Sequence, residues 1–147
     1  MRIQIKDFND FGNKNSLKVS DELIAVINDI DTLFTENSAR FRKEFRNSMT
    51  LLGYPNKGKL SPESNTYITT IKDNVGVCLQ LGNVARAGYD LLKFGYFYNV
   101  DNSFQGIFIC PNKSVGNRAG FDRVSNELEN CYKDVIKLPI RVIGIGY

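Results

Sequence analysis

Histidine is absent from the 147-residue sequence. Without it, the chain cannot form nucleophilic sites in which histidine activates serine or cysteine, nor the common zinc sites that mix histidine with cysteine. Any catalysis would therefore depend on carboxylates, lysines or a hard metal ion held by oxygen ligands.

Long apolar runs are missing too. No stretch approaches the ~18 apolar residues of a membrane span, and the opening MRIQIKDFND carries acids where a signal peptide needs apolar residues. We therefore expect a cytoplasmic protein with no membrane contact.

Cysteine is scarce, and its three copies, Cys78, Cys110 and Cys131, show no CxxC spacing and lie in apolar segments, so we expect reduced core residues. The net charge of +3 permits a polyanionic partner and argues against an acidic mimic of DNA.

The chain is organised around residues 75–98. An alternating apolar pattern predicts a strand over 75–81, and after Gly82-Asn83 an amphipathic pattern predicts a helix over 84–98. The length predicts one domain, residues 1–147. Further strands are expected at 1–6, 66–72, 105–110 and 138–145, further helices at 20–34, 38–52 and 121–135, and loops at 7–20, 54–65 and 111–120. This order predicts an α/β fold in which helices cover both faces of a mixed sheet.

Local signals refine these boundaries. Ser20 is a suitable N-cap for the first helix, and Asp73-Asn74 suits a tight turn between strands 66–72 and 75–81. The outer side of the helix over 38–52 is basic and consists of Arg40, Arg42, Lys43 and Arg46. For this side we favour a solvated surface over a phosphate-binding patch.

Four segments together resemble the BglII-type restriction endonucleases of the PD-(D/E)XK nuclease fold. They are MRIQIKDFND, VGVCLQLGNVARAGYDLLKF, GIFICPNKSVGNRAGFDRVSNEL and LPIRVIGI, in the same order as in that family. The resemblance implies a single-domain, restriction-endonuclease-like α/β/α fold with a central mixed β-sheet.

The same resemblance identifies the positions of a catalytic motif. In that family an Asp, followed about nine residues later by Glu-x-Gln, holds Mg²⁺ for phosphodiester cleavage. Gln80 matches the motif's Gln, whereas Thr69 and Cys78 stand where the Asp and the Glu are expected. The catalytic positions are therefore degenerate, and we expect no metal and no cleavage. On this charge argument, Thr69→Asp together with Cys78→Glu should restore Mg²⁺ or Mn²⁺ binding if the site geometry is kept.

Two features leave alternatives open. An active, Mg²⁺-dependent nuclease would need relocated carboxylates, for which the candidates near the motif in sequence are Asp73, Glu63 and Asp90. For Asp90 we favour a surface pair with Arg86 at i,i+4 spacing. Gln80 is equally suited to be a strand-edge amide bonded to backbone.

By resemblance, Asn83 and the loop over 111–120 lie where the family contacts bases. Asn83 is equally suited to a turn with a left-handed backbone. The candidate DNA-binding residues are Asn83, Arg86, Lys57, Lys59, Lys113, Asn117 and Arg118, with Arg40 and Arg46 on the second helix.

We thus expect a pseudonuclease that acts by binding either DNA or a component of a restriction or phage-defence system. A homodimer is one arrangement compatible with this expectation. An active DNA endonuclease and a sponge for small nucleotides are the alternatives.

Overall fold

A five-stranded mixed sheet, in the order β1-β7-β6-β5-β4, forms the centre of the computed structural model, which describes residues 1–147. A two-stranded sheet pairs β2 with β3. The elements are β1 (Arg2–Phe8), α1 (Lys14–Asp29), α2 (Ser38–Leu51), β2 (Gly58–Lys59), β3 (Tyr67–Ile68), β4 (Thr70–Lys72), β5 (Val75–Leu79), α3 (Val84–Val100), β6 (Gln105–Pro111), α4 (Phe121–Asn130) and β7 (Ile140–Gly146).

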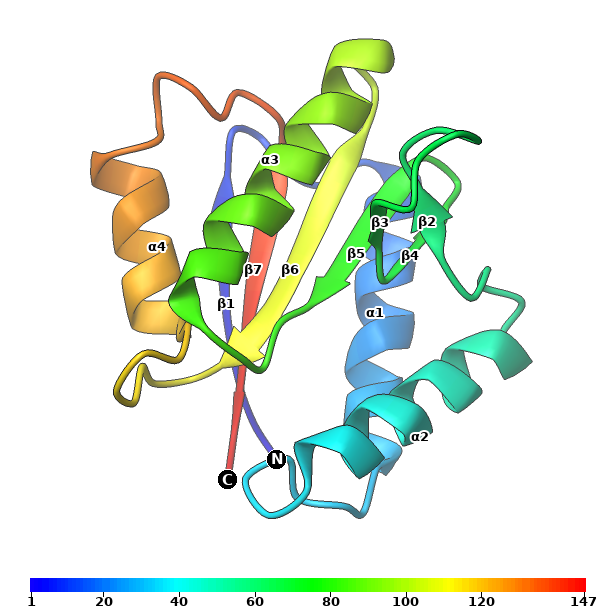
Figure 1. The fold of residues 1–147 in the computed structure, drawn as a ribbon, viewed down its shortest axis with the longest axis vertical. Coiled ribbons are helices and arrows are strands. Elements are labelled where there is room, and N and C mark those ends of the chain that lie inside the picture. Colours follow the sequence, from blue (N-terminus) through cyan, green and yellow to red (C-terminus); the bar gives the residue numbers. More distant parts are fainter.

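Strands β5, β6 and β7 run parallel, and β4 and β1 add antiparallel edges. The carboxyl ends of the three parallel strands therefore meet at one edge of the sheet, toward the lower end of Figure 1, where both chain termini also lie. In open α/β sheets such an edge is the usual place for a ligand site. This edge is called the carboxyl edge below.

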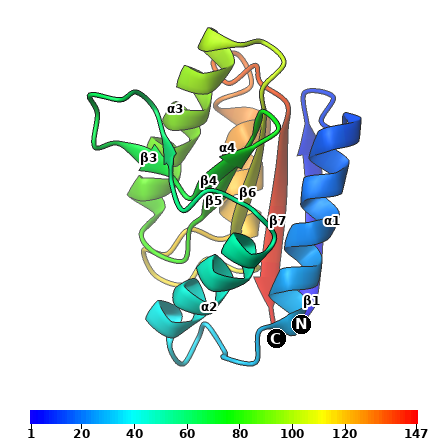
Figure 2. The same ribbon diagram turned by 90° about the vertical axis from the view of Figure 1, so that its right-hand side faces the viewer.

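Helices cover both faces of the sheet, so the predicted α/β/α architecture is confirmed. Figure 2 shows α1 on one side of the sheet and α3 with α4 on the other. The strand alternation divides the core accordingly, because Val77 and Ile107 pack with α1 and α2 whereas Cys78 and Phe108 pack with α3 and α4. None of the helices is both long enough and apolar enough to cross a membrane.

The strand predicted over 66–72 is divided in two. Tyr67–Ile68 pairs with Gly58–Lys59, inside a segment predicted to be loop, whereas Thr70–Lys72 joins the main sheet. The break falls at Thr69, whose Oγ1 accepts a hydrogen bond from the Leu79 N–H at 3.0 Å. A side chain thus satisfies the backbone group that a continuous ladder would have paired. The predicted tight turn at Asp73-Asn74 is confirmed, with φ of 52° and 60°.

The first helix begins earlier than the sequence pattern suggested. Its N-cap is Asn13, whose side chain accepts a hydrogen bond from the Ser16 N–H at 2.8 Å, and Ser20 is a buried residue inside the helix. Asn caps a helix as well as Ser does, so the composition could not separate the two positions. The helix also ends at Asp29, short of the predicted Phe34.

The last helix ends earlier than predicted, at Asn130. The N–H groups of both Cys131 and Tyr132 bond to the Glu127 carbonyl, which tightens the chain into a turn that stops the helix. Val135 is consequently 73% exposed. Cys131 is exposed as well, so the expectation of three buried cysteines is wrong for this one; Cys78 and Cys110 are buried.

Glycine at position 76 is required by close packing. A Cβ there would lie 2.5 Å from Phe104 Cζ and 2.9 Å from Ile68 Cδ1. We expect Gly76→Ala to destabilise the protein by about 1–3 kcal/mol in urea unfolding, the usual cost of overpacking. Gly95→Ala is the matched control, because no atom lies within 4 Å of a Cβ there. Since Ala is a better helix former than Gly, the control should gain about 0.5–1 kcal/mol; equal effects at the two positions would contradict the packing argument.

Candidate functional site

The three positions of the degenerate motif lie together. Gln80 directly follows β5, at the carboxyl edge. Thr69 lies beside Cys78. In the sequence, Thr69 precedes Thr70 and Cys78 follows Val77, and Thr70 and Val77 are paired between β4 and β5. The fold therefore places the three positions that the resemblance pointed to beside one another.

Gln80 is part of a buried polar network with Asp90 on α3. Its Nε2 donates to Asp90 Oδ2 at 2.9 Å, and its Oε1 accepts from the Gly82 N–H at 2.9 Å. Lys93 Nζ donates to the other oxygen, Asp90 Oδ1, at 3.1 Å. A cavity of about 510 Å³ opens over this network and is also lined by Arg86.

These contacts correct the expectation for Asp90. It is only 8% exposed and pairs with Lys93, so it is no surface partner of Arg86. The reason is that the Asp90 side chain is on the side of α3 that faces β5, whereas Arg86 is on the side that faces solvent. The interpretation of Gln80 as a backbone-bonded amide is half right, because one end of the amide binds backbone and the other binds Asp90.

Cys78 contributes no negative charge to the site. Burial raises the pKa of its thiol well above the usual range, and the neighbouring Asp90 carboxylate raises it further. The thiol is therefore protonated at neutral pH. A thiol is also a poor ligand for Mg²⁺, which prefers several oxygen ligands including carboxylates.

The residues at the motif do not fit a hard metal ion. Thr69 offers a neutral hydroxyl, and the structure contains no group of three or more His, Cys, Asp or Glu side chains that could hold a metal. Of the three candidate relocated acids, Asp73 lies in the turn that precedes β5 and Glu63 is exposed in a loop. Asp90 does lie beside Gln80, but both its oxygens are already bonded.

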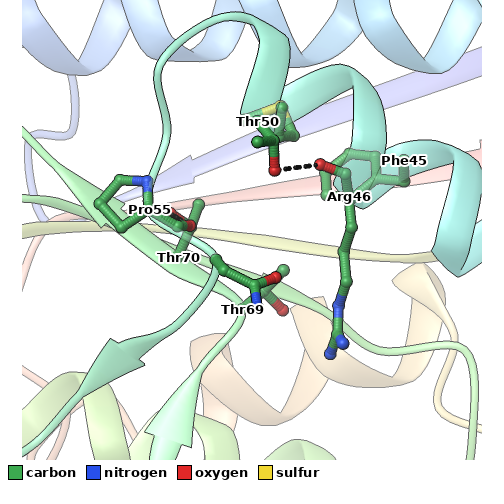
Figure 3. A pocket seen from close by; sticks show the side chains of 8 residues that line it. Phe45, Arg46, Thr50, Pro55, Thr69 and Thr70 are labelled. Atoms are coloured by element: carbon green, nitrogen blue, oxygen red, sulfur yellow. Dashed lines mark hydrogen bonds between the residues drawn. The ribbon is translucent and has the colours of Figure 1, made fainter.

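Unpaired arginines surround this motif. Arg42 and Arg46 on α2 line a small cavity together with Thr69. Figure 3 shows the adjoining pocket, in which the Arg46 side chain extends from α2 past Thr69. Burial lowers the pKa of Arg42, and the positive charges of Arg86 and Arg46 lower it further. None of these three arginines forms an ion pair, so a concentration of positive charge remains unneutralised beside the motif.

The loop after β6 is fastened to the start of α3. The Val84 N–H donates to the Asn117 carbonyl at 2.7 Å, and Asn83 and Arg118 form an isolated bridge. Asn83 has an ordinary φ of −61°, and its side chain caps α3 by accepting from the Ala85 N–H at 2.8 Å. The left-handed turn considered for Asn83 is therefore wrong. Lys113 and Arg118 line a further cavity of about 310 Å³ at the same edge.

A family model described as restriction endonuclease BglII/BglIII matches residues 13–145. The chain belongs to this BglII family. Among solved structures, that of restriction endonuclease BglII complexed with a DNA 16-mer superimposes with a TM-score of 0.79 at 14% identity, covering 100% of this chain and 79% of the other. Free BglII gives a TM-score of 0.69 at 13% identity, with 100% and 80% coverage. At these identities the likeness concerns the fold. A search of curated proteins finds no match.

Some candidate residues of this BglII-family chain lie apart from the motif. Lys57 and Lys59 belong to the segment of the small sheet, where Lys57 Nζ sits 4.6 Å from the centroid of the Tyr67 ring. Arg40 is bonded to Glu44. By contrast, five of the candidate DNA-binding residues lie at the carboxyl edge: Asn83, Arg86, Lys113, Asn117 and Arg118.

The sequence reasoning did not place Lys93 or Arg42 at the site. A weak signal for Arg42 existed, because Arg42 and Arg46 are like charges at i,i+4 spacing, which destabilises a helix unless something compensates. For Lys93, the i,i+3 spacing from Asp90 was available in the sequence. Choosing Lys93 over Arg86 as the partner required knowing which side of α3 faces the sheet.

Proposed function

We propose that this BglII-family protein binds DNA and has lost metal-dependent cleavage. The observation that carries the proposal is the chemistry at the motif, where a neutral Thr69 hydroxyl and a protonated, buried Cys78 thiol replace two carboxylates. Two carboxylates supply most of the attraction that draws a dication out of its hydration shell. Without them, neither water activation nor neutralisation of the scissile phosphate by a metal is supported.

The distribution of positive charge supports DNA as the partner. Exposed Lys113, Arg118 and Arg86 lie at one edge of the sheet, and Arg42 and Arg46 lie beside the motif. None of them is paired with an acid. Contacts of such side chains with phosphates dominate DNA affinity and do not require a metal. Association with a defence-system protein, or with a second copy of the chain, stays a prediction.

We expect the purified protein to leave supercoiled plasmid intact with either Mg²⁺ or Mn²⁺, while retarding a duplex oligonucleotide in a gel shift run in Ca²⁺ or EDTA. The binding should weaken steeply with salt, because phosphate contacts release counterions. Metal-dependent nicking by the wild-type protein would overturn the loss of cleavage. A missing gel shift at low salt would overturn DNA binding.

A second candidate, an active nuclease, is favoured by one contact, that of Asp90 with Gln80. Its test is Asp90→Asn, which keeps the size of the side chain. If the wild-type protein nicks plasmid and Asp90→Asn abolishes nicking while retaining the fold by circular dichroism, Asp90 is the relocated carboxylate. Asp73→Asn is the matched control, because it removes a carboxylate from the turn before β5, at the opposite end of that strand.

A further inference from the structure

The small cavity beside Thr69 is positively charged and open to solvent on one side. It is lined by Arg42, Phe45, Arg46, Thr69 and Leu79 and has a volume of about 20 Å³. That is enough for one water-sized group, such as one oxygen atom of a larger anion. Arg42 and Arg46 reach it from the same face of α2, since residues four apart are neighbours on a helix.

The positive charges around this cavity have no counterpart within the protein. Arg40, one turn from the cluster, is neutralised by Glu44 at 2.9 Å, whereas Arg42, Arg46 and Arg86 have neither an ion pair nor a side-chain hydrogen bond. The lowered pKa of Arg42 reports burial first and then repulsion from its two neighbours. Holding these groups together costs folding free energy, which a bound anion would offset.

Thr69 adds a neutral donor at the same place. Its Oγ1 accepts a hydrogen bond from the Leu79 N–H, which fixes the side chain, and no acceptor takes up the hydroxyl proton. The hydroxyl can therefore donate to an anion. An aspartate at this position would instead repel the anion, so the same change that removes a metal ligand suits the cavity for an anion.

We infer that this cavity binds a phosphate oxyanion directly, with Arg42, Arg46 and the Thr69 hydroxyl as donors and without a metal ion. One phosphate oxygen enters the cavity, and the guanidinium groups hold the remaining oxygens at its mouth. The site has thus changed from one that would attract a cation into one that attracts an anion. The inference rests on the proposed function only in naming DNA as a source of the phosphate; a free nucleotide is the other source with the same chemistry.

Inorganic phosphate is the first probe. At about 50 mM phosphate, compared with sodium chloride of equal ionic strength, the wild-type melting temperature should rise by roughly 3–6 °C if the concentration is near tenfold the dissociation constant. The Arg42→Gln, Arg46→Gln double variant should lose this rise. Arg123→Gln is the control for losing an arginine away from the cavity, because Arg123 lies on α4 in a pair with Glu127. Its response to phosphate should equal that of the wild type.

A second measurement separates lost binding from lost folding. In chloride, Arg46→Gln should melt at or above the wild-type temperature, because it relieves repulsion within the cluster. A phosphate effect that is absent in the wild-type protein, or that survives in the double variant, would overturn the inference.

Two further arms identify the source of the phosphate. If the source is DNA, a duplex should compete with phosphate and the double variant should bind it at least tenfold more weakly, while adenosine monophosphate has little effect. If wild-type protein fails to bind DNA but is stabilised by the nucleotide and by phosphate, the proposed function fails and the anion site stands. If DNA binding persists in the wild type without any phosphate stabilisation, the anion site fails alone.

Discussion

Restoring the two missing acids, through Thr69→Asp and Cys78→Glu, is expected to leave the protein unable to bind Mn²⁺ while Arg42 and Arg46 are present. Both guanidinium groups line the cavity beside Thr69. A carboxylate at position 69 would pair with them, and their repulsion of a dication amounts to several kcal/mol even at the effective dielectric constant of about 20 near a protein surface. This changes the expectation from the motif alone, under which the two acids should suffice.

The Mn²⁺ affinity should appear only when Arg42→Gln and Arg46→Gln are added to the two acids. We expect isothermal titration calorimetry to show at least a ~100-fold gain for this quadruple variant over the double acid variant, the equivalent of about 2.7 kcal/mol. Each acid alone in the Gln background should give much less, because a single carboxylate holds a dication weakly. Strong Mn²⁺ binding by the double acid variant would show that the arginines do not control the charge of the site.

Folding must be checked in the same experiment. Cys78 is 2% exposed and packs in the core between the sheet and α3, so Cys78→Glu places a larger, charged group in a buried position. We expect this change to lower stability without metal, by about 2–5 kcal/mol. Asp90 adds to the cost by repelling the new carboxylate, and Lys93, already paired with Asp90, offsets only part of this repulsion. Circular dichroism melts of every variant therefore accompany the titrations.

The sheet was largely predictable from local patterns. Alternation across Val77 and Cys78 requires two different faces, and the structure gives these residues to different cores. The start of α1 was predicted wrongly because Asn13 and Ser20 are almost equally good N-cap residues, and the sequence does not distinguish between them. The division of the strand at Thr69 depended on a side chain-to-backbone bond to another segment, which no local pattern specifies.

The nearness of the three motif positions could be predicted from the sequence, whereas the charges around them could not. Resemblance to the BglII family identified Thr69, Cys78 and Gln80, and the fold brings them together. The partner of Asp90 was wrong because i,i+4 spacing ignores which face of α3 meets the sheet. Arg42 and Arg46 were correctly placed on the basic side of α2, but only tertiary packing puts that side over Thr69.

The loop at the carboxyl edge is expected to carry much of the DNA affinity. Lys113→Ala with Arg118→Ala should lower the affinity for a duplex by about 10- to 100-fold at moderate salt, because both side chains are exposed and neither is paired with an acid. The slope of log affinity against log salt should become shallower by about 1.8, the value for two lost phosphate contacts. The backbone bonds that fasten the loop, from Val84 to Asn117 and from Ala119 to Gly82, do not depend on either side chain.

Lys133→Ala with Lys137→Ala is the matched control for this prediction. It removes the same number of positive charges, but from the exposed connection between α4 and β7, at the opposite edge of the sheet. A uniform attraction of a basic protein to DNA would weaken equally in both variants, whereas an interface at the carboxyl edge weakens only in the first. Fluorescence anisotropy across a salt series measures both affinity and slope. Equal losses in the two variants would therefore place the DNA contact elsewhere, even if both proteins still bind.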